Sequence, residues 1–136
     1  MNLKSAKILI TGANGFLGSH TVDIFKSKNI ENLITFSSKE FDLTKESEVQ
    51  KLFKTHTDVD IVIHIAADIG GIKYSSTYPA QQFYNNTMMN TLILHYSYLN
   101  KVKKFTLNIV FNGCSYSNSP TTPLLYQKFL IIFNYL

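Results

Sequence analysis

Short runs of aliphatic and β-branched residues alternate along this chain with longer segments in which apolar and polar residues are mixed. This alternation predicts β-strands joined by helices, which is typical of a parallel sheet with helical crossovers. Strands are expected at 7–11, 33–36, 60–65 and 105–111, and helices at 16–28, 45–56 and 79–99. We therefore expect an α/β fold with a doubly wound parallel sheet, of which the chain carries the first half, in the strand order 3-2-1-4 with right-handed crossovers.

The apolar positions of the expected helices predict which side chains face the sheet. These positions are Leu17, Val22, Ile24 and Phe25, then Val49, Leu52 and Phe53, and finally Phe83, Met88, Leu92, Leu94 and Tyr98. The third strand, DIVIHI, shows little polar alternation, as in a strand buried on both faces of a sheet. His64 lies within this run, so we expect a buried, hydrogen-bonded histidine rather than a catalytic one.

The last thirty or so residues differ from the rest in composition. Residues 1–106 hold all the charged side chains except one, Lys128. The segment LLYQKFLIIFNYL is too apolar for a solvated helix, so it must lie against the sheet, against another chain or in an aggregate. We expect a dinucleotide-binding domain at 1–111 and a divergent or truncated segment at 112–136, the product of a truncated or frame-disrupted gene. A half-domain completed by a second polypeptide is the less favoured alternative.

Composition limits the function classes. A chain of 136 residues with 45% hydrophobic residues suits a single domain. The net charge of +4 comes from scattered lysines, so no nucleic-acid partner is expected. One cysteine fits a reducing compartment, and no apolar run reaches the roughly 20 residues that span a bilayer. We expect a cytoplasmic protein with neither a metal site nor a membrane partner.

The segment that follows the first strand, TGANGFLG, carries three glycines at a spacing of three residues. A glycine turn between a strand and a helix lets backbone N–H groups and the positive end of the helix approach a pyrophosphate. The cofactor-binding residues expected in this turn are Gly12, Asn14, Gly15, Phe16, Leu17 and Gly18. The alternative is an ordinary glycine-rich turn without a ligand.

The residues after the second strand indicate which dinucleotide is bound. Ser37, Ser38 and Lys39 offer two hydroxyls and a cation, which favour the 2′-phosphate of NADP(H). An NAD-selective site usually places a carboxylate there, so NAD is the less favoured cofactor, although Glu40 lies close by.

Two further pairs of residues lie in the loops that follow expected strands. Ala66 and Ala67 follow the third strand, where their small side chains leave room for a cofactor at the ligand-binding end of a parallel sheet. Asp42 or Thr44 is expected to cap the helix that begins at residue 45.

The motif TGANGFLGS resembles the opening of the short-chain dehydrogenase/reductase superfamily, which has a Rossmann-type fold, and in particular its extended nucleotide-sugar branch. Within that branch, AADIGGIKYSSTYPAQQFYNN resembles the GDP-L-fucose synthase family. The resemblance implies an NADP(H)-dependent epimerase/reductase acting on a GDP-sugar, a family in which homodimers are common. It also implies that Gly70, Gly71 and Ile72 border the sugar-nucleotide pocket, that Asp42 and Leu43 lie beside the adenine, and that Asn86 lies near the active-site strand.

The chain departs from this pattern where the catalytic residues belong. The superfamily uses a tyrosine with a lysine four residues later, and here Leu124 takes the tyrosine's place while Lys128 keeps the lysine's. By the resemblance, Cys114 is the candidate acid or base for epimerisation, although it is equally a small buried hydrophobe. We expect an NADP-binding fragment without complete turnover. The alternatives are a non-catalytic dinucleotide- or partner-binding module, whose homodimer or partner buries the tail, and an enzyme for another nucleotide sugar.

Overall fold

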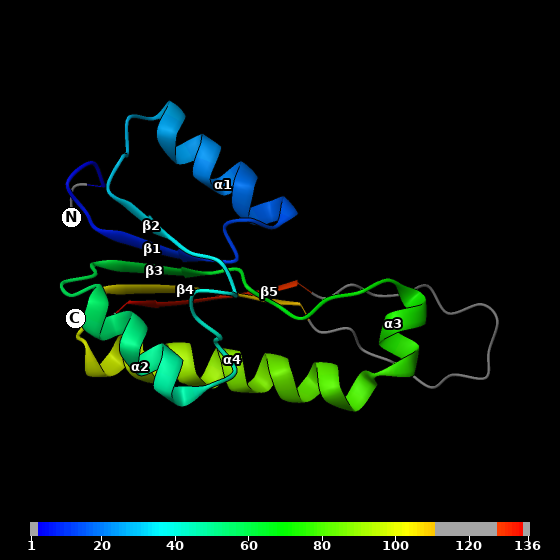
Figure 1. Cartoon of the computed structure of the whole chain (residues 1–136). Coiled ribbons are helices and arrows are strands. Elements are labelled where there is room, and N and C mark those ends of the chain that lie inside the picture. The colour runs from blue at the N-terminus through cyan, green and yellow to red at the C-terminus, as the bar shows by residue number, and fades with distance from the viewer. Residues whose placement is uncertain (1–2, 111–127, 135–136) are drawn as a thin grey trace.

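The computed structural model describes residues 3–110 and 128–134, arranged around one five-stranded sheet in the order β2-β1-β3-β4-β5 (Figure 1). The strands are β1 (Ile8–Thr11), β2 (Leu33–Thr35), β3 (Ile61–His64), β4 (Lys104–Val110) and β5 (Lys128–Asn134). The helices are α1 (Phe16–Ser27), α2 (Glu46–Thr55), α3 (Ile72–Thr77) and α4 (Pro79–Leu99). Strands β1 to β4 are parallel, so the expected α/β class is confirmed.

The expected strand order, 3-2-1-4, is wrong, because the third strand pairs directly with the first on the side away from the second. The handedness of the crossovers explains the difference. Helix α1 covers one face of the sheet, whereas α2 and α4 cover the other (Figure 1). Right-handed crossovers on opposite faces progress in opposite directions. The chain therefore reverses after β2, passes β1 and places β3 beside it.

A hydrophobic core lies on each face, since successive residues of a strand point to opposite sides. Ile8 and Ile10 of β1 face α1 and pack with its partly buried Val22 and Phe25. Leu9 belongs to the larger core beneath α2 and α4. Helix α1 thus packs on β1, the strand to which the glycine turn connects it.

The larger core confirms the inward positions predicted for α2. Val49, Leu52 and Phe53 are all buried. The ring of Phe53 stacks on Tyr96 of α4 with ring centroids 6.3 Å apart. The Tyr96 hydroxyl donates to Glu46 Oε1 at 3.2 Å, so a polar contact joins the two helices beside the core.

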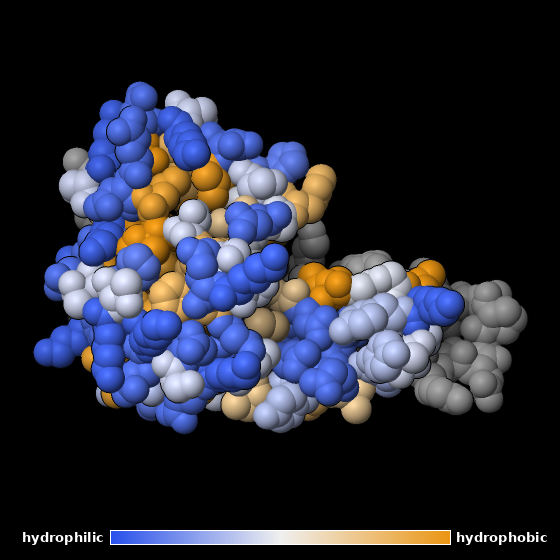
Figure 2. Space-filling model, viewed as in Figure 1, coloured by the Kyte–Doolittle hydropathy of each residue, from blue (hydrophilic) through white to orange (hydrophobic). Residues whose placement is uncertain are grey.

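Four side chains predicted to face inward are exposed instead. They are Leu17 (45% exposed) and Ile24 (55%) of α1, and Phe83 (68%) and Tyr98 (63%) of α4. Helix α1 presents a narrow apolar stripe to the sheet, and hydrophobic residues are visible at the surface between it and the sheet (Figure 2). The first turns of α4 extend beyond the strand ends (Figure 1), and Phe83 belongs to these turns. Farther along α4, Ile93 is buried and Tyr98 lies on the outer side.

Two elements add to the expected set. Helix α3 forms in a segment for which neither a helix nor a strand is predicted from the sequence. Strand β5 pairs antiparallel with β4, with Lys128 opposite Val110 and Asn134 opposite Lys104. The described part of the apolar tail, 128–134, therefore lies along the sheet, which is one of the three positions predicted for the tail. Among the described residues, no helix has both the length and the hydrophobicity needed to cross a membrane.

Candidate cofactor site

The carboxyl ends of β1 and β3 mark the point at which the sheet changes direction. The crossover from β1 leads to β2 on one side, and the crossover from β3 leads to β4 on the other. Ligands of open parallel sheets bind at such a switch point. Thr11 and His64, the last residues of the two strands, are paired in register. The glycine turn and the Ala66–Ala67 segment therefore lie side by side, and the surface is recessed between the start of α1 and α3 (Figure 2).

Gly12 brings the two loops together. Its φ of +71° lies in the left-handed region that favours glycine. A Cβ at this position would lie 2.7 Å from Ala66 N and 2.8 Å from Ala66 Cα. The close approach of the two backbones thus requires glycine on the β1 side, and it places Ala66 directly against the turn.

The start of α1 has the features of an anion site. Gly15 is the N-cap residue, no side chain caps the helix, and no acidic residue lies in its first turn. The first N–H groups of the helix therefore have no partner from a capping side chain. Gly18 is buried, and a Cβ there would overlap Gly12 O and lie 2.7 Å from Ala13 Cα. Asn14, Gly15, Phe16 and Leu17 are exposed around this helix start, while Gly12 and Gly18 form its packed base.

A buried hydrogen-bond network fixes the loop after β3. Thr11 Oγ1 accepts the N–H groups of Ile65 and Ala66, each at 3.1 Å. The Thr11 hydroxyl lies 2.6 Å from His64 Nδ1, and His64 Nε2 lies 3.0 Å from Asn90 Oδ1. Because Thr11 Oγ1 already accepts two hydrogen bonds, we assign its own proton to Nδ1, which leaves the imidazole N–H on Nε2 to donate to Asn90.

Burial sets the charge of His64. The side chain is 1% exposed, and burial lowers its pKa from 6.5 to about 4, with the hydrogen bond to Asn90 offsetting part of the effect. The imidazole is therefore neutral at physiological pH, as the assigned tautomer requires. The prediction of a buried, hydrogen-bonded histidine is confirmed.

Asp68 anchors the next part of the loop to α4. The Asn86 side chain accepts the Asp68 N–H at 2.7 Å and donates to the Asp68 carbonyl at 3.0 Å. Asn85 Nδ2 donates to the Asp68 carboxylate at 2.7 Å, and the Tyr74 hydroxyl donates to it at 3.1 Å. The hydrogen bond from Tyr74 to the Asp68 carboxylate raises the pKa of Tyr74. The loop between β3 and α3 is thus held on both sides.

The residues that the resemblance assigns to the sugar-nucleotide pocket lie beyond this anchor. A Cβ on Gly70 would overlap the Tyr74 ring, so glycine lets that ring pack over the loop. Gly71 is the N-cap residue of α3, and Ile72, its first residue, is 85% exposed. Thr11, Asp68 and Asn85 lie within the motifs quoted above from the sequence, yet no role was predicted for any of them. The one available signal was that polar residues flank the strand ends.

In the turn after β2, the hydrogen-bond donors of Ser37 bind the carboxylate of Glu40. Ser37 N and Ser37 Oγ both donate to Glu40 Oε2, at 2.7 and 2.8 Å. The backbone N–H of Ser37, followed by its hydroxyl, lowers the pKa of Glu40. Ser38 and Lys39 are exposed at the tip of the same turn.

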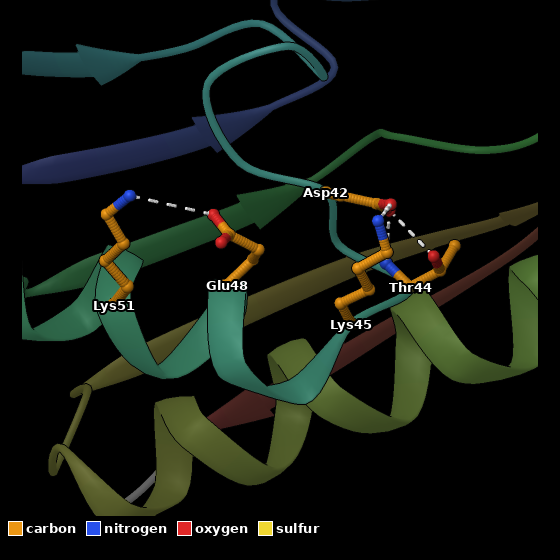
Figure 3. A network of polar contacts seen from close by, with 5 residues as sticks. All are labelled: Asp42, Thr44, Lys45, Glu48 and Lys51. Carbon is orange, nitrogen blue, oxygen red and sulfur yellow. Dashed lines mark hydrogen bonds and ion pairs between the residues drawn. The ribbon is translucent and has the colours of Figure 1, made fainter.

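Asp42 and Leu43 differ in their surroundings. Leu43 is buried in the core under α2. The Asp42 carboxylate accepts Thr44 N at 3.1 Å and Thr44 Oγ1 at 2.7 Å, and it pairs with Lys45 Nζ at 3.0 Å (Figure 3). Hydrogen bonds from Thr44 and then from Lys45 lower its pKa. The expected cap is wrong, because Lys45 is the N-cap residue of α2 and no side chain caps that helix.

The structure does not test the two catalytic candidates as a pair. Cys114 lies outside the described residues. Lys128 is the first residue of β5, opposite Val110, rather than one helical turn after a tyrosine. Within the ranges that the structure describes, no group of three His, Cys, Asp or Glu side chains could hold a metal ion.

Comparison with known proteins agrees with this geometry. The sequence model of the NAD dependent epimerase/dehydratase family matches residues 8–118. A putative GDP-L-fucose synthase 2 of Arabidopsis thaliana is 34% identical over 121 residues, which are 89% of this chain and 36% of that protein. The chain therefore spans little more than a third of this relative.

Solved structures that are similar to this chain agree with the sequence comparison. A GDP-mannoheptose C4 reductase from Campylobacter jejuni with NADP bound has a TM-score of 0.71 at 30% identity, over 77% of this chain and 32% of that one. A GDP-L-fucose synthetase from Naegleria fowleri, also bound to NADP, has a TM-score of 0.64 at 28% identity, over 77% of this chain and 31% of that one. The expected Rossmann-type fold is thus confirmed.

Proposed function

The chain belongs to the NAD dependent epimerase/dehydratase family, and from this premise we propose that it is the cofactor-binding part of a GDP-sugar epimerase/reductase similar to GDP-L-fucose synthase. The observation that carries the proposal is the contact of Gly12 with Ala66 at the switch point, beside a helix start that no side chain caps. A Cβ at Gly12 or Gly18 would fill the space in which this turn and helix meet.

We propose that a dinucleotide binds at the start of α1 and beside the loop after β3. The first N–H groups of α1 would hold the pyrophosphate, with Gly15 leaving its approach open. Ala66 and Ala67 would border the ribose on the nicotinamide side, held in place by Thr11. The bound cofactor would supply hydride for the reduction of a ketone.

For the adenosine end we propose NADP(H) rather than NAD. Ser37 and Ser38 carry hydroxyls and Lys39 a positive charge immediately beyond β2, where the adenosine ribose is bound in folds of this kind. Both solved structures described above have NADP bound, which supports this choice. Asp42 and Leu43 are proposed to lie beside the adenine.

For the substrate end we propose a GDP-sugar bordered by Gly70, Gly71 and Ile72. The support is the similarity to GDP-L-fucose synthases and the anchoring of this loop through Asp68. Turnover by this chain alone is not proposed, because Leu124 stands where the dyad needs a tyrosine. Leucine cannot transfer a proton.

Calorimetric titration of the purified chain with NADPH and NADH tests the proposal. We expect saturable binding of NADPH that is lost in Gly12→Val, whose Cβ meets the Ala66 backbone, and retained in Gly71→Ala, where a Cβ meets nothing within 4 Å. If the folded wild-type chain binds neither dinucleotide, the glycine turn is only architectural and the proposal is wrong. Titration with GDP- and UDP-sugars then tests the substrate class.

A non-catalytic partner-binding module is the second candidate, and β5 favours it. This strand pairs with β4 along one side, and it is the last strand in the sheet order. An edge strand can pair with a further chain. Mass measurement in solution distinguishes a monomer from an assembly formed through this edge.

A further inference from the structure

The turn after β2 holds a negative charge of its own. Strand β2 ends at Thr35, and the chain then folds back so that Glu40 N donates to Ser37 O at 3.0 Å. This turn carries the Glu40 carboxylate to Ser37, whose N–H and hydroxyl both donate to the same oxygen, Oε2. A carboxylate thus lies two residues beyond the strand end, although residue 37 itself is a serine.

The chemistry of these donors suits an anion. A backbone N–H and a hydroxyl that converge on one oxygen bind charged acceptors well, and Lys39 adds a positive charge on the same turn. The two Ser37 donors lower the pKa of Glu40, so the carboxylate is ionised at neutral pH. A ribose 2′-phosphate could use these donors only after displacing Glu40, because two anions cannot share them.

Unlike a 2′-phosphate, a ribose 2′-hydroxyl can bind beside Glu40 without displacing it. Both hydrogen bonds that hold Glu40 in the described structure go to Oε2, so Oε1 remains able to accept a hydroxyl proton. The same carboxylate that opposes a 2′-phosphate can therefore accept from the 2′-hydroxyl of NAD(H).

We infer that Glu40 is a specificity-determining residue that acts against the 2′-phosphate and lowers the preference for NADPH that Ser37, Ser38 and Lys39 create. This inference rests on the proposed cofactor binding. The sequence position of Glu40 alone would not support it, because the side chain could equally point into solvent. The two short hydrogen bonds to Ser37 make the carboxylate part of the subsite.

The test compares NADPH and NADH affinities of the wild-type chain with those of Glu40→Gln and Glu40→Ala. Both variants remove the charge, and alanine also frees the two Ser37 donors. Removing a charged competitor for two hydrogen bonds should raise the ratio of NADPH to NADH affinity roughly tenfold. NADH affinity should stay the same or fall.

Glu31→Gln is the matched control. Glu31 is exposed, precedes β2 at its opposite end, and its replacement makes the same change in net charge. It should leave the ratio unchanged, and circular dichroism checks the fold of each variant. The role of Glu40 is refuted if wild type binds a dinucleotide while neither Glu40 variant raises the ratio of NADPH to NADH affinity more than twofold above that of Glu31→Gln. That result leaves cofactor binding intact. If the folded wild type binds neither, both proposals fail.

Discussion

Acidification should destabilise the chain through His64 as the pH falls below about 6.5. The imidazole is buried between Thr11 and Asn90, with its pKa lowered by burial to about 4. A protonated ring would carry a proton on both nitrogens. Nδ1 could then no longer accept from Thr11, whose hydroxyl in turn holds the amides of Ile65 and Ala66.

The sign and size of the effect follow from linkage. The folded state binds the His64 proton less tightly than the unfolded state, so stability is unaffected above pH 6.5 and falls as the pH drops below it. The loss continues until about pH 4, where the folded state is protonated as well. The difference between 6.5 and about 4, at roughly 1.4 kcal/mol for each pH unit, amounts to about 3 kcal/mol.

Carboxylates contribute in a different pH range. Hydrogen bonds from Thr44 lower the pKa of Asp42, and those from Lys103 lower the pKa of Asp60, in both cases from 3.8. A lowered acid pKa stabilises the fold above the unfolded value, and this contribution disappears as the pH falls below about 3.8. The interval from pH 6.5 to 4.5 therefore reports chiefly on the histidine.

Urea unfolding followed by circular dichroism between pH 4.5 and 7.5 measures this slope. Wild type should lose up to about 1.4 kcal/mol of unfolding free energy per pH unit below 6.5. His64→Gln should be less stable at pH 7 and nearly independent of pH. His95→Gln, which removes an exposed histidine of α4, should keep the wild-type slope. Equal slopes in wild type and His64→Gln would refute the reasoning.

Three further outcomes are expected. Gly18→Ala should cost at least about 3 kcal/mol and abolish NADPH binding, because its Cβ overlaps the turn backbone, whereas Gly71→Ala should change stability by less than about 0.5 kcal/mol in the same urea assay. Asn86→Ala should cost about 1–3 kcal/mol and speed hydrogen exchange of the Asp68 amide, which NMR would detect. Phe53→Ala should cost about 3–5 kcal/mol on thermal unfolding, since its ring is buried against α4; a smaller loss would mean that the core refills the cavity.

The hydrophobic pattern is enough to predict the elements of this fold but not their order. Helix α4 begins at Pro79 and ends at Leu99 as predicted, because proline marks its first turn and no glycine or further proline interrupts the segment. The same pattern does not say which face of the sheet a helix covers. That choice decides the direction of each crossover. The predicted strand order is therefore wrong in the position of β3.

Exposure was predicted less well than secondary structure, for a related reason. Leu17 and Ile24 are apolar at plausible spacing, yet α1 contacts the sheet through Val22 and Phe25 instead. Periodicity defines a helix face only when the face is wide and continuous. Where a helix packs through a narrow stripe, tertiary contacts select the buried positions, and a single sequence holds little information about them.

The candidate site shows the same division between local and tertiary information. The glycine motif was identifiable because each glycine answers a local requirement, such as the positive φ of Gly12. The role of Thr11 was not, because it depends on residues more than fifty positions away. Thr11 ends β1, accepts the amides that follow β3 and contacts His64, so one hydroxyl joins the glycine turn to the loop that faces it. Without this hydroxyl, the loop after β3 would keep its anchor at Asp68 but lose the two hydrogen bonds that hold its first residues against the glycine turn.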